Sequence, residues 1–379
     1  MKVAVVHEWL HEWAGSEQCL AAILDILPEA DLFSVVDFLS DADRQRIGGR
    51  RPKTSFVQRL PWARSRLEMY LPWMPIAVEQ WDLSAYDLII SSSHAVAKGV
   101  ITGPDQIHLS YVYSPMRYAW DLQHQYLSIG GLGRGLRGFA ARWFLHYLRI
   151  WDVRTANGVD RFACDSAFVA RRIRKCYGRD STVIYPPIDV EKLPFRHDKE
   201  DFYLAASRLI PYKRMDLLVA AFAQIPDRRL IVIGKGPELK KLQRNATSNV
   251  DFLGRVSDSD LHDHLARARA FLFAAQEDFG ILPVEAQACG TPVIAFGRGG
   301  ARETVRGLDD PSPTGLFFDD QSVPSVIDAV RRFEAAEAGI SAAACREHAL
   351  KFGASRFKTE FSAWLETSIG TWRAGNPRA

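Results

Sequence analysis

The stretch that decides the fold is Glu277-Asp278-Phe279-Gly280-Ile281-Leu282-Pro283-Val284-Glu285-Ala286-Gln287-Ala288-Cys289-Gly290-Thr291-Pro292-Val293-Ile294. Gly280 and Pro283 predict the start of a helix, because proline is well tolerated at the beginning of a helix. Gly290 and the Thr-Pro pair behind it end this helix before the apolar run Val293–Phe296. The segment therefore predicts a loop, a short helix and a buried strand, the order typical of an α/β domain.

The start of this predicted helix is suited to a phosphate. The amides of Gly280, Ile281 and Leu282 point away from the helix, and its dipole favours negative charge there. Glu277 lies just before the helix and Glu285 in its first turn. Two carboxylates cannot both face the phosphate, so we expect each to accept hydroxyl groups. Phosphates in the middle and hydroxyls at both ends describe a nucleotide sugar; the alternative is an ordinary βα corner.

The composition bounds the class of protein. The chain has 379 residues, enough for two domains, with 47% hydrophobic and 25% charged residues. No segment approaches the roughly 20 unbroken apolar residues of a spanning helix, and the amino terminus enters a strand without signal-peptide features. Five scattered cysteines show no metal-type spacing. A net charge of +3 is too small to indicate a nucleic-acid partner, and we expect a cytoplasmic protein.

Two series of short apolar runs alternate with helical patterns, which predicts parallel sheets covered by helices. The first series comprises Val3–Val6, Leu88–Ser91, His108–Val112, Arg161–Cys164 and Thr182–Tyr185. The second comprises Phe202–Ala206, Leu230–Ile233, Val250–Leu253, Ala270–Phe273, Pro292–Phe296 and Gly315–Phe318. The stiff segment Tyr185-Pro186-Pro187-Ile188-Asp189 cannot continue a helix, so we place the domain boundary there.

The spacing of Glu277 and Glu285 resembles the E-x7-E signature of family 4 retaining glycosyltransferases, enzymes of the GT-B fold. The resemblance implies an α/β protein of two Rossmann-like domains that face each other across a cleft. Residues 1–186 would form the acceptor domain, completed by a crossover helix at about 355–379, and residues 187–354 the donor domain.

Cations follow the first strand of the predicted donor domain. Arg208 and Lys213 resemble the R-x4-K element of the family, and carboxyl ends of parallel strands are where α/β sheets bind ligands. Their charge would neutralise the diphosphate leaving group as the bond breaks. A basic surface turn is the alternative. The resemblance adds Glu277 as a catalytic residue that holds the sugar, with Phe279 and Gly280 beside it among the donor contacts.

Further donor contacts come from weaker matches. Gly234 begins a G-x-G-P loop, and Val256 lies in a segment whose backbone holds the base in relatives. In the first domain, Gly15 matches the second glycine of a G-G-x-E element, and Ser16 is a good N-cap for the helix behind it. His94 follows a strand, and in similar enzymes the matching histidine contacts the transferred sugar; a structural histidine is the alternative.

An aromatic and charged cluster follows the strand that ends at Val112. It resembles the subgroup of family 4 that contains bacterial mannosyltransferases for O-antigen and exopolysaccharide assembly. The resemblance implies that its side chains stack on an acceptor sugar and hold its hydroxyls, whereas core packing is the structural alternative. The acceptor residues we expect are Tyr113, Arg117, Trp120 and Asp121.

The segment His7-Glu8-Trp9-Leu10-His11 spells the H-E-x-x-H motif of zinc proteases. That motif needs a helix, which places both histidines on one face, and here it follows a strand directly. We therefore expect no metal site. GT-B enzymes generally do not need a bound metal, so no cofactor is expected besides the nucleotide-sugar substrate.

Basic charge is concentrated between Gly131 and Asp180, a segment that contains eleven Arg and Lys residues but only four Asp residues. Within this region, Arg134–Tyr147 mixes arginines with aromatic residues. Such a helix can lie on an anionic membrane surface, or it can be a solvated face with a core stripe. The first reading predicts peripheral contact with the inner face of the cytoplasmic membrane.

The expected function is a retaining hexosyltransferase that moves mannose or a related sugar from a GDP-sugar to a glycan or lipid-linked acceptor in bacterial polysaccharide or lipopolysaccharide synthesis. A UDP-sugar-dependent transferase, a nucleotide-sugar epimerase or hydrolase of the same fold, and an inactive sugar-nucleotide-binding subunit are the alternatives. The intact set of Arg208, Lys213, Glu277 and Glu285 argues against an inactive subunit.

Overall fold

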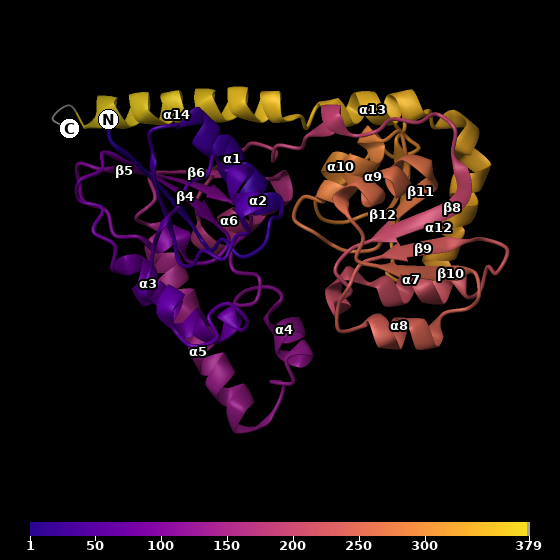
Figure 1. Ribbon diagram of the computed structural model, residues 1–379, viewed down its shortest axis with the longest axis horizontal. Coiled ribbons are helices and arrows are strands. Elements are labelled where there is room, and N and C mark those ends of the chain that lie inside the picture. Colours follow the sequence, from indigo (N-terminus) through magenta and orange to yellow (C-terminus); the bar gives the residue numbers. More distant parts are fainter. Residues whose placement is uncertain (377–379) are drawn as a thin grey trace. The chain divides into compact units, whose positions relative to one another are not determined.

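A computed structural model of the protein describes residues 1–376 and divides the chain into two compact units. The first unit comprises Met1–Pro187 and the chain from Phe357 onward, and the second comprises Ile188–Arg356. Each unit contains one parallel sheet with helices on it (Figure 1). The predicted fold class, α/β, is confirmed.

The first unit is built on a seven-stranded parallel sheet with the order β3-β2-β1-β4-β5-β6-β7. Its strands are β1 (Val3–His7), β2 (Asp31–Ser34), β3 (Lys53–Thr54), β4 (Leu88–Ser93), β5 (Ile107–Val112), β6 (Arg161–Cys164) and β7 (Ser181–Val183). Its helices are α1 (Gly15–Ile26), α2 (Asp41–Gln45), α3 (Met74–Glu79), α4 (Gln123–Ile129), α5 (Gly135–Ala156), α6 (Ala167–Tyr177) and α14 (Ala354–Gly375), with 3₁₀ segments η1 (Phe56–Arg59), η2 (Leu67–Trp73) and η3 (Ala97–Gly99).

The last helix, α14, packs on the core of the first unit. Phe357 and Phe361 are fully buried, and their rings lie 5.7 and 6.2 Å from that of Tyr111 on the central strand β5. The hydroxyl of Tyr111 donates to the carbonyl oxygen of Ile184 at 2.8 Å, which satisfies its polar atom within the core. The end of the chain thus completes one face of the first sheet.

The second unit has a six-stranded parallel sheet with the order β10-β9-β8-β11-β12-β13. The strands are β8 (Glu200–Ala206), β9 (Leu230–Ile233), β10 (Val250–Gly254), β11 (Ala268–Phe273), β12 (Val293–Phe296) and β13 (Gly315–Phe318). The helices are α7 (Met215–Phe222), α8 (Leu239–Asn245), α9 (Asp258–Arg267), α10 (Ile281–Ala288), α11 (Ala301–Thr304), α12 (Val323–Ala336) and α13 (Ala342–Leu350), with 3₁₀ segments η4 (Val190–Lys192), η5 (Pro211–Lys213) and η6 (Glu337–Gly339).

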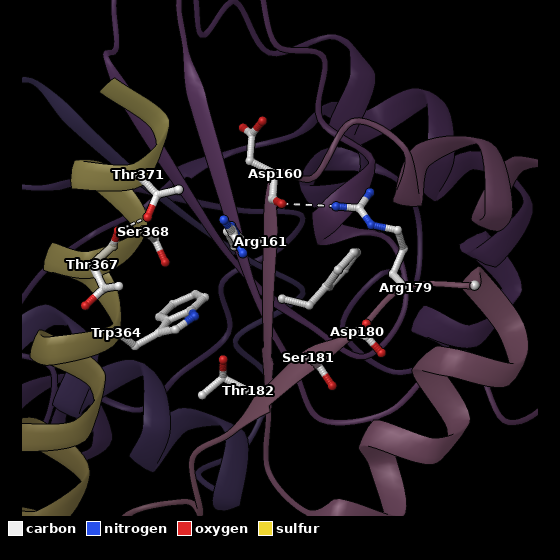
Figure 2. A pocket seen from close by; sticks show the side chains of 12 residues that line it. Asp160, Arg161, Arg179, Asp180, Ser181, Thr182, Trp364, Thr367, Ser368 and Thr371 are labelled. Atoms are coloured by element: carbon white, nitrogen blue, oxygen red, sulfur yellow. Dashed lines mark hydrogen bonds between the residues drawn. The ribbon is translucent and has the colours of Figure 1, made fainter. Parts of the chain in front are cut away.

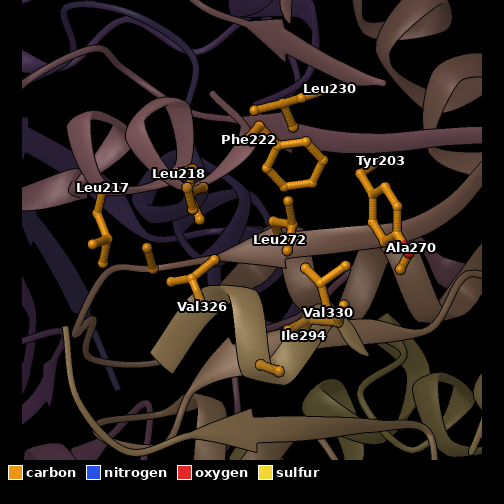
Figure 3. Close-up of a cluster of buried hydrophobic side chains, with 14 of the residues drawn as sticks. Tyr203, Leu217, Leu218, Phe222, Leu230, Ala270, Leu272, Ile294, Val326 and Val330 are labelled. Carbon is orange, nitrogen blue, oxygen red and sulfur yellow. The ribbon is translucent and has the colours of Figure 1, made fainter. Parts of the chain in front are cut away.

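The core of the second unit lies between the sheet and the helices α7 and α12. Phe222 of α7, Leu272 of β11 and Val330 of α12 belong to one cluster of buried side chains (Figure 3). Tyr203 of β8 joins this cluster with its ring, while its hydroxyl reaches out to donate to Glu334 at 2.8 Å. The packed core holds the carboxyl ends of the strands in fixed positions, which matters for the loops that follow them.

The apolar runs coincide with strands in both units, but two strands were not predicted. These are β2 and β3, which are short and extend the first sheet beyond β1. The prediction that Ser16 caps α1 is wrong. The helix begins at Gly15 after Ala14, and the carboxylate of Glu17 accepts the Ala14 N–H at 3.0 Å, so an acidic residue of the first turn does the capping.

Candidate functional site

The second unit has a topological switch point between β8 and β11. From β8 the chain proceeds to β9 on one side, and β11 pairs with β8 on the other. Loops that leave two such strands diverge, and ligands of open α/β sheets bind in the crevice that results. The segments that follow β8 and β11 contain Arg208, Lys213 and Glu277, so the fold brings these three predicted catalytic residues to one edge of the sheet.

The loop after β8 ends in the 3₁₀ segment η5. Pro211 is its first residue and fixes the backbone there, and Lys213 is its last residue. Arg214 then adopts a left-handed conformation with φ 56°, which turns the chain into α7. Arg208 is exposed, and its guanidinium donates to the hydroxyl of Tyr212 at 3.3 Å. The loop therefore presents two cations at the carboxyl end of a central strand.

The loop after β11 places a carboxylate against one of these cations. Lys213 Nζ donates to Glu277 Oε1, and both side chains are largely buried. The loop is braced from behind by the segment after β12. Gly300 N–H donates to the carbonyl oxygen of Glu277 at 2.8 Å, and a Cβ at Gly299 would come within 2.3 Å of that same oxygen. Gly299 and Gly300 are thus required for the close approach that holds Glu277.

Two predicted donor residues lie on loops at the same edge of the sheet. Gly234 follows β9 with φ 145°, and a Cβ there would come within 1.8 Å of the carbonyl oxygen of Ser207. This glycine lets the β9 loop pack on the loop that carries Arg208. Val256 is half-buried in the loop between β10 and α9. The structure gives Gly234 a packing role, and direct donor contact by both residues stays a prediction.

The helix α10, Ile281–Ala288, follows the Glu277 loop in the segment where the sequence predicts a short helix. Gly280 is its N-cap with φ 93°, and Ile281 and Leu282 are half-buried residues of its first turn, whose amides have no partner within the helix. Phe279 is buried, and its ring meets that of Phe352 edge-on at 5.6 Å. The backbone of this corner is therefore available to a ligand, whereas the Phe279 side chain belongs to the core.

Glu285 lies in the second turn of α10, not in the first as predicted, because the helix begins at Ile281. Its carboxylate is largely buried and lies 4.0 Å from the imidazole of His262. Burial and the nearby charge of Asp258 raise the pKa of Glu285 to about 7. Near neutral pH this carboxyl group can therefore either accept or donate a hydrogen bond.

The first unit repeats the arrangement with a switch point between β1 and β4. Gly15 is the first residue of α1 in the segment after β1, and His94 directly follows β4. The ring of His94 meets that of Trp9 edge-on at 4.6 Å. Burial lowers the pKa of His94, while Glu8 raises it in part, so the imidazole is neutral at physiological pH.

Glu8 is the anchor of the His94 loop. Its fully buried carboxylate accepts the backbone N–H groups of residues 94, 95, 96 and 97 at 2.7 to 3.0 Å. It also accepts the hydroxyl of Ser93 at 2.9 Å. Burial alone would raise the pKa of Glu8, but the hydrogen bonds from these backbone amides lower it, so the group is ionised. In this protein the Glu8 of the H-E-x-x-H sequence is a backbone clamp.

The two histidines of the H-E-x-x-H sequence are not in a helix and so share no helix face. His7 is buried at the end of β1, where Nδ1 pairs with Ser92 Oγ at 2.9 Å and Nε2 lies 3.5 Å from Glu17. His11 lies in a loop, with Nε2 2.7 Å from the carbonyl oxygen of Arg64. Their nitrogens are committed to separate partners, which fits the expectation that the sequence is no zinc-protease site.

The predicted acceptor residues carry structural contacts in the first unit. Tyr113 pairs with Ser92 at 2.7 Å and donates to the carbonyl oxygen of Ser16 at 3.0 Å. Trp120 Nε1 donates to Asp152 at 2.8 Å, and Asp121 forms an ion pair with Arg172. Arg117 is half-buried and lies near enough to His94 to contribute to its lowered pKa. A role for these four in acceptor binding stays a prediction.

A pocket in the first unit lies away from the switch point of that unit. It opens at the amino ends of β6 and β7 under α14, and Arg161, Thr182, Trp364 and Ser368 are among its lining residues (Figure 2). The predicted site residues of the first unit follow the carboxyl ends of strands, at the opposite edge of the sheet. This pocket therefore contains none of them.

The arrangement in the second unit is suited to an anion with hydroxyl groups at its ends. Two cations and a helix start can hold phosphate, and the carboxylates of Glu277 and Glu285 can accept hydroxyl groups. Sequence reasoning missed the supporting residues Glu8, Gly299 and Gly300. The Gly-Gly pair after the strand Val293–Phe296 was the available signal for close backbone packing, whereas the partners of Glu8 are too distant in sequence to be recognised.

The comparison with known families matches the second unit. Residues 189–352 match the family described as "Glycosyl transferases group 1". The chain is 33% identical over 197 residues to a GDP-mannose-dependent monoacylated alpha-(1-6)-phosphatidylinositol monomannoside mannosyltransferase of Corynebacterium glutamicum, covering 44% of this chain and 50% of that protein. It is 31% identical over 265 residues to a D-inositol 3-phosphate glycosyltransferase of Mycobacterium marinum, covering 60% of this chain and 54% of that protein. The chain spans about half the length of these curated relatives.

Solved structures match nearly the whole chain in fold. Alr3699/HepE of Anabaena in complex with UDP has a TM-score of 0.69 at 18% identity, covering 97% of this chain and all of that one. A sucrose-phosphate synthase of Thermosynechococcus elongatus has a TM-score of 0.74 at 17% identity, covering 98% of this chain and 100% of that one. The GT-B fold expected from the sequence is therefore confirmed.

Replacing Glu8 by Gln tests the anchor. The amide has one acceptor oxygen and turns an NH₂ group toward backbone donors, so we expect a loss of about 1–3 kcal/mol in the free energy of unfolding. Hydrogen exchange of residues 94–97 should accelerate, as measured by mass spectrometry. Glu12→Gln, an exposed neighbour, is the matched control and should change neither quantity. Unaltered exchange in Glu8→Gln would show that the carboxylate does not hold this loop.

Proposed function

We propose that the protein is a retaining hexosyltransferase that takes mannose or a related sugar from a GDP-sugar. The observation that carries the proposal is the meeting of Arg208, Lys213 and Glu277 at the switch point of the second unit. This is also the unit that matches the glycosyl transferase family. The GDP-mannose dependence named for the Corynebacterium relative supports GDP-mannose as the donor.

The cations act on the diphosphate of the donor. Arg208 is exposed and can turn toward a ligand, whereas Lys213 is held in place by Glu277. A positive charge beside the diphosphate stabilises the negative charge that develops when the sugar leaves. The first-turn amides of α10 add a positive helix end. Glu277 holds sugar hydroxyls, and Glu285 receives the ribose of the nucleotide.

The proposed transfer needs no nucleophile from the protein. The bond between the anomeric carbon and the phosphate oxygen breaks, and its electron pair leaves with the diphosphate. The acceptor hydroxyl oxygen forms the new bond on the same face of the sugar, and its proton passes to the departing phosphate oxygen. The family resemblance implies that His94, a neutral imidazole on an anchored loop, is a further contact of the transferred sugar.

The acceptor is a glycan or a lipid-linked saccharide of bacterial polysaccharide or lipopolysaccharide assembly. The aromatic and charged segment that contains Tyr113 and Trp120 supports this class, as do the lipid acceptors in the names of the mannosyltransferase relatives. A UDP-sugar transferase is the second candidate, because UDP-glucose is named in a complex of the Anabaena structure. Nucleotide binding distinguishes the two donors.

Calorimetry with GDP, UDP and ADP in the presence of EDTA tests the donor and the absence of a metal requirement. We expect GDP to bind tightest. Arg208→Met should weaken its binding by about tenfold to a hundredfold, because one charge-assisted contact to phosphate contributes about 1.5–3 kcal/mol. Lys240→Met on the exposed face of α8 is the matched control and should bind as the wild type does. Tighter binding of UDP would mean that the donor is a UDP-sugar. No binding of any of the three nucleotides would contradict the proposal that the protein is a glycosyltransferase.

The stereochemistry of the product tests retention. With an α-linked GDP-mannose donor and an accepted acceptor, proton NMR should show an α linkage in the product, because attack and departure share one face. Release of free sugar without an acceptor would indicate a hydrolase instead. A β linkage would exclude the retaining route and require an inverting one.

Proton release tests the contact of Glu285 with the ribose. In the free protein its pKa is about 7, so the carboxyl group is partly protonated at pH 6.5. Ribose hydroxyls that donate to the carboxylate favour the ionised form and lower this pKa, so GDP binding should release protons between about pH 6 and 8. Calorimetry in buffers of different ionisation enthalpy measures the number released. Glu285→Gln should abolish the release, and release that persists in this variant would remove Glu285 from the ribose site.

A further inference from the structure

The helix α5 of the first unit has apolar side chains on two opposite faces. The buried face comprises Gly138, Leu145, Leu148, Asp152 and Thr155. About half a turn away, at helical spacing of three and four residues, lie five exposed apolar side chains. They are Leu136, Phe139, Trp143, Tyr147 and Ile150, and we call them the α5 stripe.

The α5 stripe is unusual for a surface helix. Leu136 is 89% exposed and Phe139 68%, and the five residues extend for about 21 Å along the helix. The amino-terminal half of α5 and the helix α4 extend away from the sheet of the first unit (Figure 1). A contiguous apolar face of this kind marks an interaction surface.

Exposed apolar side chains continue on the neighbouring elements. Phe56, Trp62, Met69, Trp73 and Ile76 are exposed on the segment from η1 to α3. This segment packs beside α5, since Trp151 Nε1 of α5 donates to Glu79 of α3 at 2.7 Å and both helices contribute to one buried cluster. Apolar side chains are therefore exposed on two adjoining parts of the first unit.

The charge around this surface is predominantly positive. The sequence contains no Asp or Glu from residue 122 to residue 151, a span that includes Arg134, Arg137, Arg142 and Arg149. The next acidic residue, Asp152, is fully buried against Lys98. The second segment, 51–79, has five Arg and Lys residues against two Glu. An anionic surface is the complement of such a face.

We infer that the α5 stripe docks the first unit on an anionic phospholipid bilayer. Aromatic and aliphatic side chains enter the boundary between headgroups and acyl chains, and the arginines beside them contact the lipid phosphates. A second copy of the chain fits this surface less well, because a two-fold contact through the stripe would bring the arginines of both copies together. Within residues 1–376 no helix is long and apolar enough to cross a bilayer, so the contact is made at the surface.

Vesicle flotation of the whole protein tests the inference. We expect binding to vesicles of phosphatidylcholine mixed with phosphatidylglycerol and little binding to phosphatidylcholine alone. Phe139→Ser combined with Trp143→Ser should lower the partition coefficient by at least about tenfold through lost apolar burial. Arg134→Gln combined with Arg137→Gln should lower it by about 25-fold, about fivefold for each charge, and high salt should mimic this loss.

Matched controls separate docking from other causes. Leu308→Ser combined with Leu350→Ser removes two exposed leucines of the second unit and should leave vesicle binding unchanged. All substituted side chains are exposed, so circular dichroism should be the same for every variant. Absence of binding to anionic vesicles would overturn the inference. So would binding that is retained by both the Phe139→Ser, Trp143→Ser variant and the Arg134→Gln, Arg137→Gln variant. Sedimentation showing a dimer that the Phe139→Ser, Trp143→Ser variant dissociates, without vesicle binding, would assign the stripe to a second copy instead.

Discussion

The ion pair between Lys213 and Glu277 is the contact on which the proposed site depends. It joins the loop after β8 to the loop after β11, and these strands are neighbours only because the chain reverses its direction of travel across the sheet. The carboxylate compensates the charge of the half-buried lysine, which would otherwise be costly to desolvate. The same two loops carry Arg208 and lead into the start of α10, so the ion pair that stabilises the loops also positions the groups proposed to hold the diphosphate.

The first unit solves a related problem with a single buried carboxylate. Glu8 holds four consecutive backbone amides and thereby fixes the loop that presents His94 after β4. A charge so deeply buried is tolerated because five hydrogen-bond donors, four backbone amides and the Ser93 hydroxyl, point at the carboxylate. In both units, then, a carboxylate after or at the end of a central strand orders the loop of a neighbouring strand, and glycines such as Gly234 and Gly299 permit the close packing of the loops.

The sequence could predict elements whose signals are local. The short helix α10 and the strand β12 lie in the segments where the sequence predicts them, because Gly280, Gly290 and the proline at 292 interrupt the backbone at fixed points. The strand β2 was not predicted, since only Leu32 and Phe33 of its four residues are apolar. The role of Glu8 could not be predicted either, because its partners lie about 86 residues away and only tertiary folding brings them together. The cap of α1 was assigned to Ser16 because serine is a common cap, whereas Ala14 is the N-cap residue and Glu17 accepts its N–H.

The central claim is that the switch point of the second unit binds the diphosphate of a nucleotide sugar, and a crystal structure with GDP bound tests it most directly. The account predicts diphosphate density within hydrogen-bond distance of Arg208 and Lys213, at the carboxyl ends of β8 and β11, with the ribose beside Glu285. Density for the nucleotide elsewhere, for example in the pocket under α14, would contradict the assignment of the donor site. So would a nucleotide at the switch point whose phosphates contact neither cation.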